Sequence, residues 1–476
     1  VGSDGCVDSD GDGLTDPNDS CPNGVSGWTS NSSTDYDQDG CLDSEGWIFA
    51  ESIGSSSSNM VTSVTLDHLG NSIISGRYYG TLTLGNHSIT NPSTSYSLFI
   101  AKKASDGTWL WLKGAGGSTN SPTTQSESID VDSQGNIFVT GHFTNTVSFG
   151  STSLTSPGDY DVFVAKIASN GTWLWATRAG GTCGGYGKDI RVDSSGDALV
   201  VGFYSNSAAT FGTTTLSNSN NLIDIYVAKI SSSGSWQWAI RAGGSSSDYA
   251  YSIDLDSSGS GYVTGFFKGT ASFGSTSLTA SGDKDVFVAK VSNSGSWQWA
   301  VKAGGSDDEV AYDISYSSGD LYITGEFEGT PSFGSTTLTA PSNSYSDAFV
   351  AKLDQNGTWD WAVGINGSGP ISGRAIDTTS SNVYVSGTFS STATFGSTSL
   401  TSSGQDDEFI SSLALNGSWV WAKQFGGNYG DNSYDLISNS NGTLYLVGTT
   451  SSTPAYFGNL TVSSTAFFAK YAQAED

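Results

Sequence analysis

The sequence predicts an all-β protein: a seven-bladed β-propeller that is closed by an N-terminal strand completing the last blade, and that follows a loop-rich calcium-binding segment. Three observations predict the repeat. Tryptophan pairs spaced i, i+2 return every 60 to 64 residues, the string Phe-Val-Ala-Lys or a close variant occurs seven times, and an apolar run ending near a glycine also occurs seven times. A regular period of this length is the signature of a repeat architecture. The tryptophan pairs begin at Trp109, Trp173, Trp236, Trp297, Trp359 and Trp419.

Each repeat is expected to form four short strands. In one unit these are residues 252–256, 262–265, 286–291 and 297–301, with a hairpin-like insertion at 272–278. Alternating β-branched and aromatic residues between Gly, Ser, Asn and Asp turns give the two-residue period of strands. Four strands in about 60 residues fit one propeller blade.

The two ends of the repeat region predict how the ring closes. The last unit stops after its third strand, at 467–471, and no Trp-x-Trp strand follows it. Such a strand stands instead at 46–51, Gly-Trp-Ile-Phe-Ala-Glu. Pairing these segments would remove the open sheet edge. We therefore predict two regions, an acidic segment over 1–45 and the propeller over 46–476.

The repeat, for example residues 252–265 followed by 287–290, resembles the microbial seven-bladed β-propeller repeat family often called SBBP. The resemblance covers about nine tenths of the chain. It implies the propeller fold and a secreted or surface location rather than a particular activity.

The recurrent side chains are interpreted as structural. Residues at i and i+2 share one strand face, so each tryptophan pair is expected to pack between neighbouring blades rather than to bind sugars. The repeated lysine of Phe-Val-Ala-Lys is expected to pair with an acid on a neighbouring strand. It occurs at Lys102, Lys166, Lys229, Lys290, Lys352 and Lys470, and is Ser412 in the sixth unit.

The acidic segment carries the spacing of calcium loops. Residues 1–45 hold eleven acids and no Lys or Arg. Ca²⁺ prefers six to eight hard oxygen ligands, and alternate acids followed by a turn glycine supply them, with a backbone carbonyl at position 7. Gly46 cannot act at position 12 of the second loop, where Glu45 or a water is the substitute. The predicted ligands are Asp8, Asp10, Asp12, Leu14, Asp16 and Asp19 in the first loop, and Asp35, Asp37, Asp39, Cys41 and Asp43 in the second.

With Asp-Ser-Cys-Pro at 19–22, this segment resembles the thrombospondin type 3 repeat, although the spacer at 24–34 is longer than that family's pattern. The resemblance implies that calcium and disulfides order the segment. We predict a Cys21–Cys41 disulfide. Cys6 and Cys183 then pair within one chain or with a neighbouring molecule, and four cysteines allow three connectivities.

The composition of the chain argues against several classes of function. The net charge of −28 disfavours nucleic-acid binding, and no apolar run reaches the length of a membrane helix. The cysteines, the start at Val1 and nine Asn-x-Ser/Thr sequons predict a secreted, extracellular protein with candidate glycosylation sites. Only three histidines are present, and neither a Ser-His-Asp set nor zinc spacing is recognisable. Asp307, Asp308 and Glu309 are interpreted as a solvated acidic loop rather than a cation site.

The first hypothesis is therefore a non-enzymatic structural or adhesive protein, a calcium-stabilised subunit that self-associates into an extracellular filament, matrix or surface layer. A carbohydrate-binding propeller that uses loop aromatics and acids on one rim is the alternative. A polysaccharide-active enzyme is the third hypothesis.

Overall fold

The computed structural model describes residues 46–54, 59–117, 123–182, 184–205, 208–218, 222–341 and 345–472. The regular elements in these ranges are all strands, and their pairing is antiparallel throughout. The predicted calcium ligands between Asp8 and Asp43, the Cys21–Cys41 pair, Cys6 and Cys183 lie outside the described residues.

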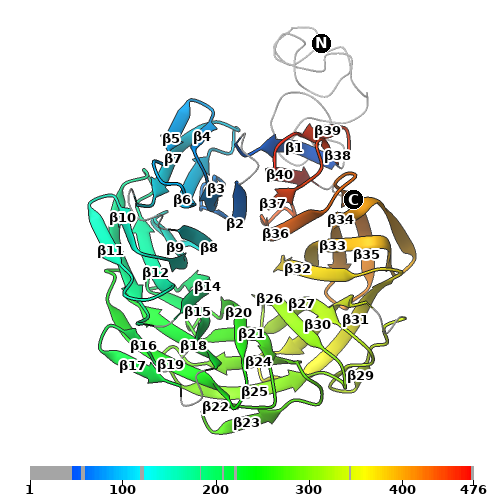
Figure 1. The fold of residues 1–476 in the computed structure, drawn as a ribbon. Coiled ribbons are helices and arrows are strands. Elements are labelled where there is room, and N and C mark those ends of the chain that lie inside the picture. The colour runs from blue at the N-terminus through cyan, green and yellow to red at the C-terminus, as the bar shows by residue number, and fades with distance from the viewer. Residues whose placement is uncertain are drawn as a thin grey trace, which may run out of the picture.

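The strands form a ring of four-stranded units around a central axis (Figure 1). In each unit the chain begins next to the axis and moves outward, one strand at a time. The innermost strands are β2 (Met60–Leu66), β8 (Thr124–Val131), β14 (Gly185–Val192), β20 (Tyr249–Leu255), β26 (Glu309–Ser317), β32 (Ile371–Thr378) and β36 (Asp431–Ser438). The second strands are β3 (Ser72–Tyr78), β9 (Ile137–Phe143), β15 (Ala198–Ser205), β21 (Gly261–Phe267), β27 (Asp320–Phe327), β33 (Asn382–Phe395) and β37 (Leu444–Thr450).

The two outer positions complete each sheet. The third strands are β6 (Ser97–Lys103), β12 (Asp161–Ile167), β18 (Ile223–Ile230), β24 (Asp285–Val291), β30 (Asp347–Asp354), β34 (Thr398–Ala414) and β40 (Ala466–Ala472). The outermost strands are β7 (Trp109–Ala115), β13 (Trp173–Ala179), β19 (Trp236–Gly244), β25 (Trp297–Ala303), β31 (Trp359–Gly367), β35 (Trp419–Phe425) and β1 (Gly46–Ser52).

A short hairpin lies between the second and third strands of each unit. In the β32 unit it is continuous with the long strands β33 and β34, which pair over Thr392–Phe395 and Thr398–Thr401. The separate hairpin strands are β4 (Thr81–Leu84), β5 (His87–Thr90), β10 (Thr146–Phe149), β11 (Thr152–Thr155), β16 (Ala208–Phe211), β17 (Thr214–Ser217), β22 (Thr270–Phe273), β23 (Thr276–Thr279), β28 (Ser332–Phe333), β29 (Thr336–Thr337), β38 (Ala455–Phe457) and β39 (Leu460–Val462).

The N-terminal strand closes the ring, as the sequence predicts. β1 pairs with β40 from Gly46↔Ala472 to Ser52↔Phe467, and β1 lies beside β40 in Figure 1. The indole of Trp47 meets the rings of Phe425 and Phe457, each at 4.9 Å between centroids. This pairing joins the two ends of the repeat region and removes the sheet edge that β40 would otherwise expose.

The recurrent tryptophans connect neighbouring units, as predicted, and the recurrent lysines pair with acids of their own unit. The second tryptophan of a pair donates its indole N–H to a turn of the next unit: Trp175 to Ser232 O at 3.1 Å, and Trp238 to Asn293 O at 3.1 Å. The repeated lysine forms an ion pair with an acid, which in the first four units lies in the turn after the innermost strand. The pairs are Lys102–Asp67, Lys166–Asp132, Lys229–Asp193, Lys290–Asp256 and Lys352–Asp320, at 2.6 to 3.2 Å.

Each innermost strand contains a β-bulge at the same position. The register between the first two strands of a unit shifts by one residue there. Examples are the shift between Gly187 and Asp189 and the shift between Gly373 and Ala375. A bulge leaves one residue without a partner on the neighbouring strand, and its side chain does not follow the regular alternation between the two faces of the sheet. These unpaired residues line the central opening and form the site described next.

Candidate functional site

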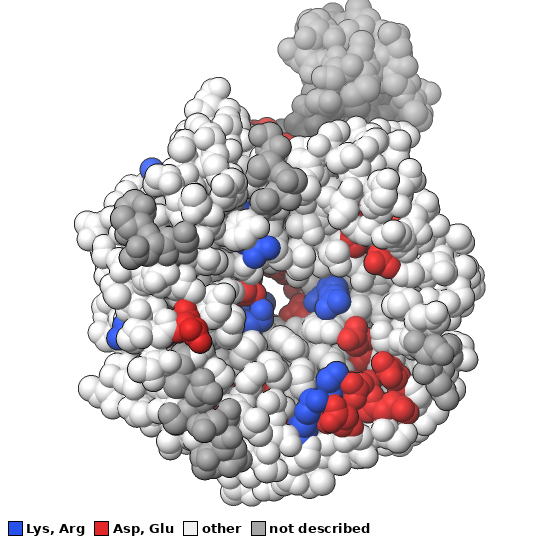
Figure 2. Space-filling view, in the orientation of Figure 1, with Lys and Arg blue, Asp and Glu red and all other residues white. Residues whose placement is uncertain are grey.

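The seven bulge residues meet at one end of the central channel and form what we call the channel mouth. It surrounds a cavity of about 550 Å³. Figure 2 shows a central opening in the ring, with basic side chains at its edge and acidic side chains deeper inside. The channel mouth consists of Thr62, Glu127, Lys188, Tyr251, Tyr312, Arg374 and Tyr434.

Contacts between neighbouring units hold these side chains in place. Lys188 forms an ion pair of 2.5 Å with Glu127. The rings of Tyr251 and Tyr312 lie 5.5 Å apart, and the guanidinium of Arg374 lies 4.4 Å from the centre of the Tyr312 ring. Burial works to raise the pKa of Glu127, but Lys188 and His142 outweigh it and lower the pKa to about 2. The mouth therefore combines fixed charges with partly exposed aromatic faces.

An aromatic arc runs from the mouth across the neighbouring units. Its rings are partly exposed and follow one another at centroid separations of 4.7 to 6.3 Å. A tyrosine ring offers an apolar face for packing and a hydroxyl at its edge for hydrogen bonding, and this combination suits a surface that binds a polar ligand. The members of the arc are Tyr160, Tyr186, Phe203, Tyr249, Tyr251 and Tyr312.

A belt of hydrogen bonds lies directly below the mouth, at the residues that follow the bulges, except in β32, where that residue is Ala375. Asp189 accepts from Ser128 Oγ at 2.6 Å in one neighbouring unit and from Ser252 Oγ at 2.9 Å in the other. Ser252 Oγ also lies 2.7 Å from Oδ1 of Asp313, whose second oxygen accepts from the backbone of Ile376 at 2.8 Å. These side chains bind the innermost strands to one another and hold the channel open.

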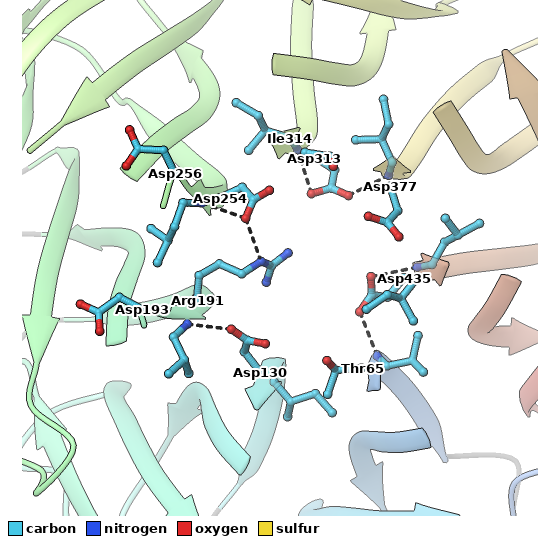
Figure 3. A pocket seen from close by; sticks show the side chains of 18 of the residues that line it. Thr65, Asp130, Arg191, Asp193, Asp254, Asp256, Asp313, Ile314, Asp377 and Asp435 are labelled. Carbon is cyan, nitrogen blue, oxygen red and sulfur yellow. Dashed lines mark hydrogen bonds and ion pairs between the residues drawn. The ribbon is translucent and has the colours of Figure 1, made fainter. Parts of the chain in front are cut away.

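Below the belt lies an acidic cavity of about 390 Å³, which we call the inner chamber. Figure 3 shows a single arginine, Arg191, between the carboxylates of Asp130 and Asp254, while Asp193 and Asp256 point away from it. Arg191 donates to Asp189 at 2.7 Å, and its Nε lies 3.8 Å from Asp254. The labelled acids are Asp130, Asp193, Asp254, Asp256, Asp313, Asp377 and Asp435.

Burial changes the protonation of the carboxyl groups in the inner chamber. Burial raises the pKa of Asp313 to about 8, against hydrogen bonds from Ser252 and Ile376. Burial likewise raises the pKa of Asp254 and of Asp435 to about 6. Burial works to lower the pKa of Arg191, but Asp189, Asp254 and Asp130 outweigh it and raise that pKa. At neutral pH the chamber thus holds one permanent cation and several carboxyl groups that keep a proton more readily than usual.

The structure changes one sequence-based interpretation. Asp308 of the acidic loop is paired with Lys284 at 2.6 Å, but Glu309 is fully buried and is not a solvated residue. It begins β26, and Oε2 accepts from the backbone of Gly305 at 2.9 Å. In the described part of the chain, no group of three or more His, Cys, Asp or Glu side chains is placed to hold a metal ion.

Sequence reasoning missed the mouth because its residues are about 60 positions apart and differ chemically. One signal was available. In each repeat the position just before Ser-Ile, Asp-Ile or an equivalent pair varies among Thr, Glu, Lys, Tyr and Arg, whereas the residue before it is always Val, Ser, Gly or Ala. A variable position within a regular repeat indicates a side chain that the fold does not need.

The fold and this channel define a β-propeller-type protein. No protein family model matches the chain. Regulatory protein FlaEY of Caulobacter vibrioides is 27% identical over 316 residues, which covers 61% of this chain and 33% of FlaEY. An uncharacterized WD repeat-containing protein of Acanthamoeba polyphaga mimivirus is 26% identical over 340 residues, 57% of this chain and 24% of that protein. The chain thus spans a third or less of the curated relatives it matches.

Solved structures of similar fold include enzymes. Apocarotenoid oxygenase of Synechocystis is 8% identical, with 88% of this chain and 95% of that chain covered and a TM-score of 0.42. Virginiamycin B lyase of Staphylococcus aureus is 10% identical, with 71% and 96% covered and a TM-score of 0.28. At these identities the similarity concerns the fold alone.

The prediction that this protein is not an enzyme is therefore corrected. Two of the solved structures named above, an oxygenase and a lyase, are enzymes. The sequence argument rested on the lack of a recognisable catalytic set. The absence of a linear motif is weak evidence in this fold, because the ring brings acids, tyrosines and cations from distant repeats into one channel.

The structure contains, within its described ranges, no helix long and apolar enough to cross a membrane.

Proposed function

We propose that this chain is a seven-bladed β-propeller of a secreted adhesive or structural protein, and that the channel mouth binds a saccharide. The observation that carries the proposal is the set of three tyrosines that the bulges of β20, β26 and β36 place around one opening, Tyr251, Tyr312 and Tyr434. Partly exposed tyrosine rings stack on the apolar faces of sugar rings, and their hydroxyls bond to sugar hydroxyls.

The shape and polarity of the mouth support this ligand class. A cavity of about 550 Å³ accommodates a small sugar unit, and binding cavities of this size combine aromatic walls with a few placed polar groups. Here the polar groups are the Lys188–Glu127 pair and Arg374. The aromatic arc offers further ring faces beyond the mouth, which suits an extended polysaccharide.

The seven-blade count rests on the seven innermost strands and on the β1–β40 closure. The extracellular location is supported by the sequons, six of which have exposed asparagines in the described ranges. These are Asn86, Asn170, Asn356, Asn416, Asn441 and Asn459.

The adhesive role also includes the acidic segment 1–45. We propose that it binds Ca²⁺ and mediates self-association into an extracellular assembly. β1 is the outermost strand of its sheet, so the segment that precedes it is attached at the outside of the ring. This position suits a contact with another subunit.

A glycan array tests the binding function. We expect the full chain to bind a subset of oligosaccharides, and Tyr251→Ala and Tyr312→Ala to weaken this binding by about ten-fold or more. Tyr456→Ala is the matched control, because Tyr456 is 53% exposed and lies on β38, away from the mouth. Equal binding by all three variants would place the saccharide elsewhere, and no binding by the parent chain would reject the function.

A further inference from the structure

Arg374 is the uncompensated cation of the channel mouth. Three basic residues border the passage from the mouth to the belt: Lys188, Arg191 and Arg374. Lys188 is paired with Glu127 at 2.5 Å, and Arg191 with Asp189 at 2.7 Å. Among the described residues, Arg374 has neither an ion pair nor a hydrogen bond, and its contact is the face of the Tyr312 ring at 4.4 Å.

This arrangement leaves the hydrogen-bonding edge of Arg374 free. Stacking on Tyr312 uses the flat face of the guanidinium and fixes its plane, while its N–H groups keep their bonding capacity. A planar guanidinium binds a carboxylate through two parallel hydrogen bonds, which are stronger than bonds between neutral groups. Arg374 is partly buried, so water screens this interaction less than at an open surface.

The charges farther inside limit where an anion can lie. Seven aspartates, Arg191 and a similar number of aliphatic side chains line the inner chamber, and those aspartates that are ionised repel an anion that moves past the belt. At physiological ionic strength, charges beyond about 8 Å are largely screened, so the overall charge of −28 does not keep an anion away from Arg374. An acidic group is therefore favoured at the mouth and disfavoured below it.

We propose that Arg374 recognises the carboxylate of an acidic saccharide, with the sugar ring against Tyr312 and the following sugars along the aromatic arc. The ligand class is then a polysaccharide that contains uronic acid. This inference rests on the proposed saccharide-binding function and specifies its ligand.

The test is an array that carries uronic-acid oligosaccharides beside their methyl esters, which keep the sugar and lose the charge. With the full chain in calcium-containing buffer, we expect an acid to bind about ten-fold more tightly than its ester, and binding to weaken with added salt. Arg374→Gln should abolish the preference and leave ester binding within about two-fold, and Arg374→Lys should restore part of it. Arg241→Gln is the control, because Arg241 lies on the outermost strand β19, away from the mouth, and its side chain is 39% exposed.

The outcomes separate the two proposals. If acid and ester bind equally, or if Arg374→Gln keeps the preference, the inference about Arg374 is wrong while saccharide binding stands. If no sugar binds, both proposals fail. Binding of poly-glutamate in place of sugars, lost in Arg374→Gln, would overturn the saccharide and identify an acidic peptide.

Discussion

The carboxylate of Asp435 accepts a hydrogen bond of 2.7 Å from the hydroxyl of Ser63, a residue 372 positions earlier in the chain. The same oxygen accepts from the backbone N–H of Val64 at 2.9 Å. This contact joins the last innermost strand, β36, to the first, β2. The ring is therefore closed twice, by β1 against β40 at the outside and by Asp435 beside the channel.

Asp435→Ala is expected to destabilise the ring by about 1 to 3 kcal/mol, because it leaves a buried hydroxyl and a buried N–H without their acceptor. The midpoint of urea unfolding at constant m-value measures the effect. Asp159→Ala, at an exposed position, is the control and should leave the midpoint unchanged. An unchanged midpoint for Asp435→Ala would show that the outer β1–β40 pairing alone closes the ring.

The pH dependence of stability is predicted from Glu309. Burial raises the pKa of Glu309 to about 8 in the folded protein, and repulsion from Asp285 adds to this. An unfolded glutamate has a pKa near 4.3, so between about pH 4.5 and 8 the folded state keeps a proton that the unfolded state releases. Stability should therefore fall as pH rises through this window, by about 1.4 kcal/mol per pH unit for one such group.

Glu309→Gln should reduce this slope by about 1.4 kcal/mol per pH unit and raise stability at pH 8. Thermal unfolding from pH 5 to 8 checks it, with Asp360→Asn as the control, since the Asp360 side chain is 58% exposed. A slope that is the same in Glu309→Gln and in the parent chain would mean that Glu309 is ionised in the folded state.

Glu408 is a buried acid in a position that other units fill with apolar side chains. It is 0% exposed, and neither carboxylate oxygen has a hydrogen-bond partner among the described residues. Burial raises its pKa well above the usual range, with repulsion from Asp431 and Asp407. The equivalent residues, directly before the Phe or Tyr of the third strand, include Leu98, Val162, Ile225 and Val286.

Glu408→Leu is therefore expected to stabilise the protein by about 1 to 3 kcal/mol at pH 7.5. Chemical unfolding measures the gain, and Glu408→Gln, which removes the charge but keeps a polar group, should give a smaller one. A loss of stability in Glu408→Leu would indicate that the carboxyl group has a partner that the isolated chain does not contain.

The tryptophan contacts allow a matched comparison. Trp175 donates its indole N–H to Ser232 O at 3.1 Å, in the turn between the third and outermost strands of the next unit. The buried indole N–H of Trp421 has no partner among the described residues. The next unit after Trp421 ends with β40 and β1, which belong to opposite ends of the chain, so no such turn joins them.

Trp175→Phe should therefore cost about 1 kcal/mol more than Trp421→Phe, because only the first substitution removes a hydrogen bond. Urea unfolding of the two variants side by side checks this difference. Equal losses would show that ring packing, rather than the indole N–H, provides the contact between units.

Calcium removal tests the acidic segment. We expect a chelator to expose residues 1–45 to protease and to dissociate ordered assemblies, while the near-UV circular dichroism of the ring stays unchanged. Electron microscopy with calcium and with chelator checks the assemblies, and a chain carrying Asp8→Asn and Asp12→Asn should resemble the chelated sample. Monodisperse particles under both conditions would remove the assembly role.

Much of the fold follows from the repeat itself. The tryptophan pairs, the Phe-Val-Ala-Lys strings and the missing last strand predicted the strand order and the pairing of 46–51 with 467–471, because the two-residue period and turn residues are local signals. The structural roles of Trp175 and Lys229 were predictable for the same reason, since a residue repeated in nearly every unit serves what the units share.

The candidate site depended on tertiary structure. The local sequence does not predict that Tyr251, Tyr312 and Arg374 lie around one opening. Each side chain is turned toward the channel by a β-bulge, and the bulges come together only when the ring closes. The burial of Glu309 was likewise not predictable from sequence. Its charge suggested a solvated loop, whereas packing between units buries it. Sequence alone determined the repeating strands and their contacts, which are short-range. The tertiary structure decided which variable side chains share one opening, because that depends on how distant units are arranged around a common axis.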